Sequence, residues 1–439
     1  MKKIMYRSYF TFIIVIAVVL GVLAFLIRMF TYGDDWVMLR ANQSVFHDGV
    51  LNTGTLTDRS GVVLAHASDG VYSYAEDVTV RESCFHVVGD YAGNVGTGAL
   101  TLFGSRLSGY DPINGTVSIG GKGKVVRLSI DSDMNMIAYN ALAGRRGAVI
   151  VSNYKNGEIL CLVSSPSYDP NTTPDLESSS YEGLYLNRAM GATYTPGSIF
   201  KIITLAAAIE NITDLENMTF SCTGQVTVGG DIVTCTGIHG EQTIEQAFAH
   251  SCNCAFSEIS QILGSEIIAE YAKELGLCDS LDLNGAATKA GNFENTEIGT
   301  SDLSWSGIGQ YTNLLSPFAM LRVVSAVANN GLVAEPSLLK GDRTSETFLM
   351  YESTANKIAS MMNYNVIYEY GEAVFTGLKI NAKTGTAEVG NGNDHSWFVG
   401  YLNDNEYPYA FTVIIENGGG GLANAGALAN KVLQAAVCR

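Results

Sequence analysis

The chain has 439 residues, of which 47% are hydrophobic, and a formal net charge of −17 at pH 7. At about 150 residues per domain, this length predicts two or three folded units. The excess of acidic residues argues against a nucleic-acid-binding protein and against attachment to a membrane through a basic surface.

The N-terminal residues 1–33 predict a cytoplasmic tip and an uncleaved membrane anchor. Residues 10–27 read FTFIIVIAVVLGVLAFLI, carry no charge and approach the length of about 20 apolar residues that spans a bilayer. Lys2, Lys3 and Arg7 precede this run, so the N-terminus is expected in the cytoplasm and the remaining chain outside it. A cleaved signal peptide is the alternative, but its apolar region would be shorter, and residues 28–32 make a poor cleavage site. We therefore expect a single-pass protein of the cell membrane.

Residues 34–145 predict a small β-rich domain, called the pedestal below. Gly54–Ala65 is expected to form two strands joined by a turn at Asp58–Gly61. The chain up to about residue 125 is rich in Gly, Ser, Thr and Tyr and shows no long helical period. A helix is expected at Ser132–Leu142, where apolar residues recur at helical spacing.

Residues 146–439 predict an α+β domain built on an antiparallel five-stranded sheet. Residues 148–151 and 159–163 flank an Asn156-Gly157 turn and are expected to form a hairpin. Three more strands are expected at residues 378–388, 396–402 and 409–416. Helices are expected at residues 198–210, 244–249, 255–263, 267–275 and 317–329. Early and late strands around a helical middle indicate one sheet with helices packed on it.

The eight cysteines are too sparse for a disulfide-stabilised scaffold. Cys222 and Cys235 bracket a Gly-rich polar segment and could form a disulfide across a hairpin. Zinc binding by Cys222, Cys235, His239 and either Cys252 or Cys254 is the alternative, which the absence of a C-x-x-C spacing disfavours. On this basis we expect no metal site.

A candidate nucleophile lies at Ser198, in the stretch Ser198-Ile199-Phe200-Lys201. Residues i and i+3 share one face of a helix, so Lys201 would lie beside Ser198 and could serve as its base. The residues after Ser198 are apolar almost all round, which predicts a buried helix. A buried lysine is expected to have a lowered pKa. N-capping is the alternative role for the serine, but it leaves a buried Lys201 unexplained.

A second polar element, Ser251-Cys252-Asn253, follows a predicted helix. Ser251 could relay a proton between Lys201 and a leaving amine. Asn253 offers both a donor and an acceptor, which suits it to orienting a peptide bond.

A third element, Lys383-Thr384-Gly385-Thr386, lies on a predicted edge strand. Thr384 and Thr386 would face the same side of that strand, and Gly385 would allow another backbone to approach closely. Together with Lys383, the two threonines predict a socket for a carboxylate. The strand edge could bind an extended peptide by strand addition.

The three elements in this order resemble those of penicillin-interacting serine enzymes. The wider sequence resembles the transpeptidase domain of class B penicillin-binding proteins, and the resemblance covers nearly the whole chain. The spacing, the short pedestal and a segment with His86–Gly89 and Thr97-Gly98 are most similar to the small penicillin-binding protein A type, a D,D-transpeptidase. Further segments similar to the family are Gly54–Ala65, Ser165–Asn171, Tyr194–Ser198, Ile308–Gln310, Ser316–Pro317, Ala328–Gly331 and Trp397–Tyr401.

The resemblance implies the penicillin-binding transpeptidase fold and an enzyme that crosslinks peptidoglycan stem peptides through a serine acyl-enzyme, a target of β-lactams. It implies an oxyanion hole made by the backbone N–H groups of Ser198 and Thr386. It implies no cofactor, and it implies a multi-pass glycan polymerase of the shape, elongation, division and sporulation family as partner of the pedestal. The implied catalytic residues are Ser198, Lys201, Ser251 and Lys383, and the implied substrate-binding residues are Asn253, Thr384, Gly385 and Thr386.

Other functions stay open at this point. A D,D-carboxypeptidase would use the same chemistry. A class A-like β-lactamase would be shorter and secreted, and it would need a glutamate to activate water, for which Glu294 and Glu297 are candidates. A membrane penicillin sensor or assembly scaffold would not need to keep Lys201 or Lys383.

Overall fold

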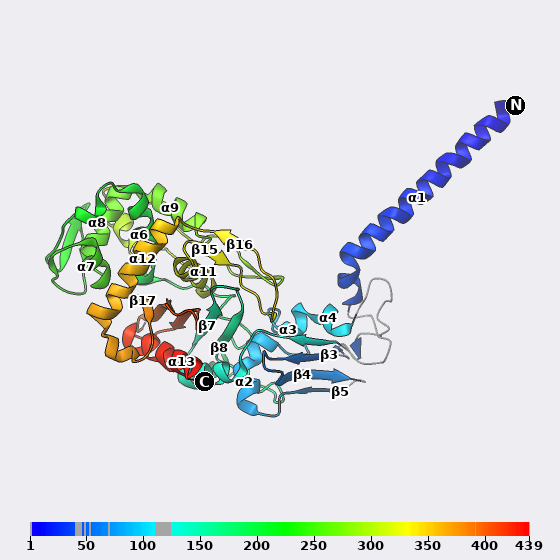
Figure 1. Cartoon of the computed structure of the whole chain (residues 1–439), viewed down its shortest axis with the longest axis horizontal. Coiled ribbons are helices and arrows are strands. Elements are labelled where there is room, and N and C mark those ends of the chain that lie inside the picture. The colour runs from blue at the N-terminus through cyan, green and yellow to red at the C-terminus, as the bar shows by residue number, and fades with distance from the viewer. Residues whose placement is uncertain are drawn as a thin grey trace.

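The structure is a computed structural model that describes residues 2–39, 46–47, 50–51, 54–68, 71–109, 124–390 and 392–438. Its first element, α1 (Lys2–Val37), extends away from the folded body as a single helix (Figure 1). Within α1, Lys3–Gly33 is long and apolar enough to cross a membrane, and none of its most apolar stretch is buried. The anchor predicted at residues 10–27 lies inside this helix. Within the predicted pedestal, residues 40–45, 48–49, 52–53, 69–70 and 110–123 lie outside the described residues.

A four-stranded sheet with the order β5-β4-β3-β6 forms the centre of the pedestal. The pedestal strands are β1 (Phe46–His47), β2 (Val50–Leu51), β3 (Gly54–Thr57), β4 (Val63–Ser68), β5 (Val71–Tyr74) and β6 (Val125–Arg127). Strands β3 and β4 pair antiparallel, which confirms the predicted hairpin. Asp58 holds its turn, because its Oδ1 accepts hydrogen bonds of 2.8 Å from the backbone N–H groups of residues 60, 61 and 62.

The pedestal also contains a helix, α2 (Val78–Val88), that we did not predict. Asp77 caps it by accepting a hydrogen bond of 2.6 Å from the Thr79 N–H. Residues 83–88 are all buried, so packing against the rest of the protein stabilises this helix more than an amphipathic pattern does. The short helices α3 (Ala99–Leu102) and α4 (Gly104–Ser108) follow.

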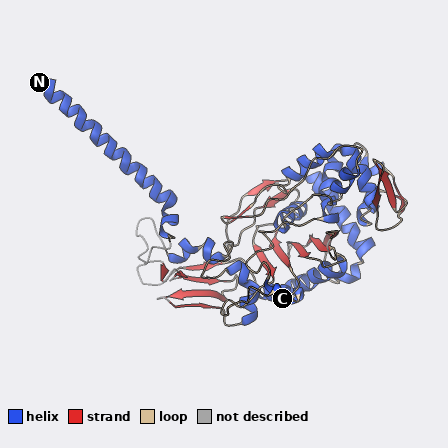
Figure 2. Cartoon of the chain, turned by 180° about the vertical axis from the view of Figure 1, so that it is seen from behind, coloured by secondary structure: helices blue, strands red, loops and turns tan. Residues whose placement is uncertain are grey.

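The second unit contains the predicted five-stranded sheet, among the strands drawn in red in Figure 2. Its strand order is β17-β18-β19-β7-β8. Every pairing in it is antiparallel, and each strand lies within three residues of its predicted ends. Its strands are β7 (Gly147–Asn153), β8 (Ile159–Ser165), β17 (Ile380–Ala387), β18 (His395–Leu402) and β19 (Tyr409–Ile415). The order places β17, with Lys383 to Thr386, at an edge of the sheet as predicted.

Helices cover both faces of this sheet. Helices α5 (Ser132–Leu142) and α13 (Ala427–Val437) share a core with Phe398 of β18. Its neighbour Trp397 points into the opposite core, which contains α11 (Pro317–Ala328), because successive strand residues face opposite sides. The bounds of α5 match the prediction, and α11 ends one residue earlier than predicted. Helix α13 was not predicted.

The remaining elements lie between β8 and α13 in the chain. The helices predicted around residues 244–275 are confirmed, whereas α10 and α12 were not predicted. The α-helices are α6 (Lys201–Asn211), α7 (Ile244–Ala249), α8 (Asn253–Leu263), α9 (Ser265–Glu274), α10 (Ser301–Gly307) and α12 (Glu352–Tyr364). Short 3-10 helices lie at Ser179–Tyr181, Gly197–Phe200, Leu215–Asn217 and Glu372–Phe375, and π-helices at Asn365–Tyr370 and Leu422–Gly426. Two-stranded sheets pair β9 (Phe220–Cys222) with β12 (Gly240–Gln242), β10 (Gln225–Val228) with β11 (Asp231–Thr234), β13 (Asp282–Leu283) with β14 (Ala286–Ala287), and β15 (Leu332–Ala334) with β16 (Glu346–Phe348).

A charged pair connects the pedestal to the second unit. The Arg81 guanidinium on α2 donates from Nε to Asp169 Oδ1 at 2.7 Å and from a terminal nitrogen to Oδ2 at 2.6 Å. Two parallel bonds of this kind fix orientation as well as distance. The segment Ser165–Asn171, noted in the sequence, is therefore part of the contact between the two units.

Candidate active site

The polar elements singled out in the sequence meet at one cleft. The cleft has a volume of about 500 Å³, and its lining includes Ser198, Ser251, Asn253, Thr384 and Thr386. They come from the turn before α6, the segment joining α7 to α8, the start of α8, and the edge strand β17. Residues far apart in the chain are thus mounted on regular elements around a single space.

Ser198 lies on the 3-10 turn Gly197–Phe200, and not on the first turn of an α-helix as predicted. Helix α6 starts only at Lys201, and its residues 201–208 are all buried. The predicted adjacency of the two side chains is confirmed nevertheless, because Lys201 Nζ lies 3.1 Å from Ser198 Oγ.

The fully buried Lys201 amine is surrounded by oxygen atoms. It donates to the Ser251 carbonyl oxygen at 2.6 Å and to Asn253 Oδ1 at 2.8 Å, and it lies 3.1 Å from the Ser251 hydroxyl. A neutral amine has two hydrogens and one lone pair. The carbonyl and amide oxygens can accept both hydrogens, which leaves the lone pair for a hydroxyl proton. Burial lowers the pKa of Lys201 to about 8, so this amine can act as a base near neutral pH.

Lys383 is fully buried as well, and it shares a hydroxyl with Lys201. Its Nζ donates to Ser251 Oγ at 3.1 Å and to the Thr384 carbonyl oxygen at 3.1 Å. Burial, followed by the charge of Lys201, lowers the pKa of Lys383 well below its usual value. Lys383 itself does not line the cleft. Of the predicted carboxylate socket, the two threonines line the cleft, and the buried Lys383 amine lies next to the Thr384 carbonyl oxygen and the Ser251 hydroxyl.

Tyr370 supports the edge strand and was missed in the sequence. It ends the π-helix Asn365–Tyr370 and lines the cleft. Its hydroxyl accepts a hydrogen bond of 3.0 Å from the Thr384 N–H and lies 3.2 Å from Thr384 Oγ1. No motif surrounds this tyrosine, and its place depends on how the segment after α12 packs against β17.

Two glycines let the turn with Ser198 lie against β17. Gly197 has a φ of +55°, and a Cβ there would lie 2.4 Å from the Thr386 carbonyl oxygen. A Cβ at Gly385 would lie 3.0 Å from the Pro196 carbonyl oxygen. A side chain at either position would push the turn away from the strand. This close contact sets the backbones of Ser198 and Thr386 side by side, as an oxyanion hole built from both would require.

The cleft also has acidic residues, but these do not bond to the serine or the lysine. Glu369, Glu388 and Asp394 line it, whereas Glu294 and Glu297, considered above as water-activating groups, do not. Within the described residues, the hydrogen bonds of Ser198 and Lys201 involve no carboxylate. The arrangement provides a nucleophile and a base for acyl transfer.

The cysteines near the site differ from expectation. All eight are free thiols in the structure, so the disulfide considered between Cys222 and Cys235 is not formed. Cys252 and Cys254, which flank Asn253 in the sequence, are buried, and neither lines the cleft. In the part of the chain that the structure describes, one group of side chains could hold a metal ion, and it includes Cys252.

Comparison with known proteins agrees with this geometry. The family described as the penicillin binding protein transpeptidase domain matches residues 147–434, well over half of the chain. This chain belongs to that family. The match covers every residue that we predicted for the active site.

The relatives of this penicillin-binding protein are of class B. This chain is 30% identical over 380 residues to the peptidoglycan D,D-transpeptidase PbpA of Mycobacterium tuberculosis. The match covers 76% of this chain and 75% of that protein. A structure of penicillin-binding protein A from the same organism, a ceftriaxone acyl-enzyme complex, matches with a TM-score of 0.73 and 25% identity, covering 88% of this chain and 98% of that one. A D,D-transpeptidase domain from Eggerthella lenta matches with a TM-score of 0.74 and 26% identity over the same shares. The chain is thus a class B penicillin-binding protein with the transpeptidase fold.

Proposed function

We propose that this penicillin-binding protein is a serine-type peptidoglycan D,D-transpeptidase, in which Ser198 is the nucleophile and Lys201 its base. The Ser198 oxygen attacks the carbonyl carbon of the penultimate D-Ala of a stem peptide, and the Lys201 amine takes the hydroxyl proton. The C–N bond to the terminal D-Ala breaks, and that D-Ala leaves as a protonated amine. An amine of a second stem peptide then attacks the acyl carbon, the C–O bond to Ser198 breaks, and the proton lost by the amine passes through Lys201 to the serine oxygen. A β-lactam acylates the same oxygen.

The other cleft residues have supporting roles in this proposal. Ser251 lies between Lys201 and Lys383 and passes the proton to the leaving amine. Asn253 orients the stem peptide. Thr384 and Thr386 bind the terminal carboxylate, and the buried Lys383 amine holds the Thr384 carbonyl oxygen and the Ser251 hydroxyl in place. The close packing at Gly385 supports the oxyanion hole of Ser198 and Thr386.

The observation that carries the proposal is the contact between Lys201 and Ser198 at the floor of the cleft. The amine is fully buried, has a lowered pKa and lies 3.1 Å from the serine hydroxyl. A nucleophile of this kind needs an adjacent base, and a buried amine supplies one.

Product analysis distinguishes this function from its alternatives. Full-length protein in detergent is incubated with pentapeptide donor and acceptor stem peptides, and the products are identified by mass spectrometry. We expect crosslinked peptides with one D-Ala released per crosslink, and no products with Ser198→Ala. Released D-Ala without crosslinks would indicate a carboxypeptidase. Rapid β-lactam hydrolysis would indicate a β-lactamase, and a stable β-lactam adduct without peptide products would indicate a sensor or scaffold.

In the proposed organisation, residues 1–33 are the cytoplasmic tip and single membrane span, residues 34–145 the pedestal, and residues 146–439 the transpeptidase domain outside the cytoplasm. The apolar helix α1 supports the anchor. None of the described pedestal residues lines the cleft, which leaves the pedestal available to bind a multi-pass glycan polymerase of the shape, elongation, division and sporulation family. Both edges of its sheet present exposed apolar side chains, Val71 on β5 (72% exposed) and Val125 on β6 (64%).

Co-purification from membranes tests the pedestal contact. Val71→Asp and Val125→Asp are expected to weaken the recovery of such a polymerase with the full-length protein, because a charge cannot be buried cheaply in an apolar contact. Ile298→Asp is the matched control, since Ile298 is 70% exposed in the transpeptidase domain. Unchanged recovery with both pedestal variants would move the contact to the anchor or the transpeptidase domain.

A further inference from the structure

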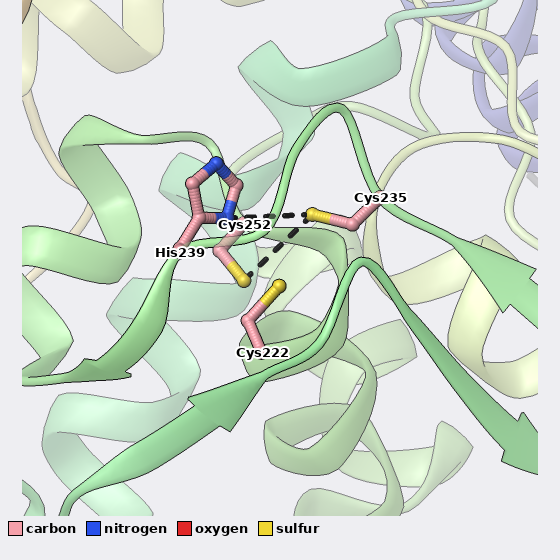
Figure 3. A group of neighbouring side chains, drawn as sticks. All are labelled: Cys222, Cys235, His239 and Cys252. Carbon is pink, nitrogen blue, oxygen red and sulfur yellow. Dashed lines mark hydrogen bonds between the residues drawn. The ribbon is translucent and has the colours of Figure 1, made fainter.

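Four side chains that can bind a metal gather next to the Ser251–Asn253 segment (Figure 3). Cys222 ends β9, Cys235 follows β11, His239 precedes β12 and Cys252 immediately precedes α8. Their ligand atoms all lie within 4.8 Å of one another. The sequence spacing argued against zinc because no two ligands form a C-x-x-C pair. In the fold, the four ligands meet although each one lies on or beside a different helix or strand.

Two of the distances between these ligand atoms match the edges of a zinc-centred tetrahedron, and the others are at most 4.8 Å. With Zn–S bonds of about 2.3 Å and Zn–N bonds of about 2.0–2.1 Å, tetrahedral geometry separates two sulfurs by about 3.8 Å and a sulfur from a nitrogen by about 3.6 Å. Cys235 Sγ lies 3.8 Å from Cys252 Sγ and 3.6 Å from His239 Nδ1. Three sulfurs and one imidazole nitrogen are a ligand set typical of structural zinc.

The segment that carries the ligands has little core of its own. Residues 220–242 form two sheets of two strands each, β9 with β12 and β10 with β11, and such ribbons are marginally stable in water. Along β10 and β11, Val233 is the one buried residue. A metal bound by three residues of this segment and by Cys252 would join both ribbons to the start of α8, and metal binding of this kind contributes directly to folding.

The surroundings of Cys235 suit a metal-bound sulfur. The Asn253 N–H donates to Cys235 Sγ at 3.2 Å, and such contacts orient and stabilise metal-bound sulfur. Each coordinating thiol gives up its proton on binding the metal, so Cys222 would lose its 3.5 Å hydrogen bond to the Gly237 carbonyl oxygen.

We propose that Cys222, Cys235, His239 and Cys252 form a structural zinc(II) site that holds the Ser251–Asn253 segment in its active position. Cys252 separates Ser251 from Asn253, and both neighbours are bonded to Lys201. Ser251 has a φ of +54°, a conformation that residues other than glycine rarely adopt and that persists where surrounding contacts hold it. A metal bond to Cys252 is such a contact. The binding of zinc does not depend on the proposed function, whereas its effect on acylation does.

Metal analysis of the full-length protein tests the site. Protein purified in detergent with reductant and without added metal is expected to contain about one zinc ion per chain by elemental mass spectrometry. Exchange with cobalt(II) should give thiolate-to-cobalt absorption and the intense visible bands of a tetrahedral site. Protein without zinc that does not bind added zinc, or a Cys235–Cys252 disulfide found by peptide mapping, would overturn the proposal.

Variants and alkylation identify the ligands. Cys222→Ser and His239→Ala should lose the zinc, while Cys254→Ser and Cys278→Ser should retain it. Because the first two variants could fail to fold, alkylation of the wild type provides an independent measurement. Cys235 and Cys278 are both half-buried. A chelator should nevertheless increase the labelling of Cys235 by iodoacetamide and leave that of Cys278 unchanged. Equal labelling of Cys235 before and after chelation, or loss of zinc from Cys254→Ser with retention in His239→Ala, would refute the ligand set.

The effect on the active site is measured by β-lactam acylation. Removing zinc is expected to slow acylation by up to about 10²-fold, the cost of a displacement of about 1 Å in a catalytic group, and added zinc should restore the rate. An unchanged acylation rate in the zinc-free protein would refute the positioning role. Zinc-bound protein that is never acylated would contradict the proposed function while supporting the metal site.

Discussion

Replacing Ser198 with alanine is expected to abolish covalent labelling of the full-length protein by a fluorescent penicillin. The label is retained only if a bond forms to a nucleophilic oxygen. Ser198 supplies a cleft hydroxyl 3.1 Å from Lys201, on the 3-10 turn that leads into the buried helix α6. Ser251 also lies 3.1 Å from Lys201, but its hydroxyl is shared with Lys383, which suits it to proton transfer. In-gel fluorescence and intact-mass measurement would record the loss.

A matched serine substitution separates this effect from loss of the fold. Ser180 is exposed and does not line the cleft, so Ser180→Ala should be labelled at the wild-type rate. Both variants should keep the wild-type melting temperature, because neither serine side chain fills a core position. Labelling of Ser198→Ala at the wild-type rate would show that another residue is the nucleophile.

Replacing Lys201 with alanine is expected to slow acylation by about 10²–10⁴-fold, the usual contribution of a general base. The serine would keep its place on the 3-10 turn but lose the group that accepts its proton. Lys201→Arg should be similarly slow, because a guanidinium stays protonated and cannot act as a base. Stopped-flow measurement of acylation would give the rates, and Lys289→Ala, at an exposed lysine, is the control.

The pH dependence of acylation tests the same assignment. Since burial lowers the pKa of Lys201 to about 8, the neutral amine is the minor form below that pH and the major form above it. The acylation rate should therefore rise with pH through about 8 and level off, and this rise should be absent from Lys201→Ala. A wild-type rate that is flat between pH 6 and 9, or a rise that persists in the variant, would contradict a basic role for Lys201.

Local patterns were sufficient for much of the fold. The strands β7, β8, β17, β18 and β19 were predicted because runs of buried apolar residues and turn residues lie close together in the chain. The helices α2 and α12 were missed because neither shows a long apolar stripe on one side. Most of α2 is buried, so its apolar residues are not confined to one side. The buried side of α12 begins with the small residues Thr354 and Ala355, which leaves only a short apolar stripe. Each of these helices therefore depends on packing for its stability.

The sequence by itself determined the chemical groups of the active site and their order along the chain. Ser198 and Lys201 are three residues apart, and a helical turn of either kind brings such residues together. The same holds for Thr384 and Thr386, which alternate on one strand and so share a side. Each of these relations is local, and each was confirmed.

Only the tertiary structure decided how these groups meet. Lys383 is hidden behind the threonines because β17 packs against the Ser251 segment, a contact between residues 132 positions apart. Cys222, Cys235, His239 and Cys252 converge because two short ribbons fold back on the start of α8, although their spacing in the chain fits no zinc motif. Contacts of this kind depend on how distant elements pack together, which local periodicity and motif spacing do not specify.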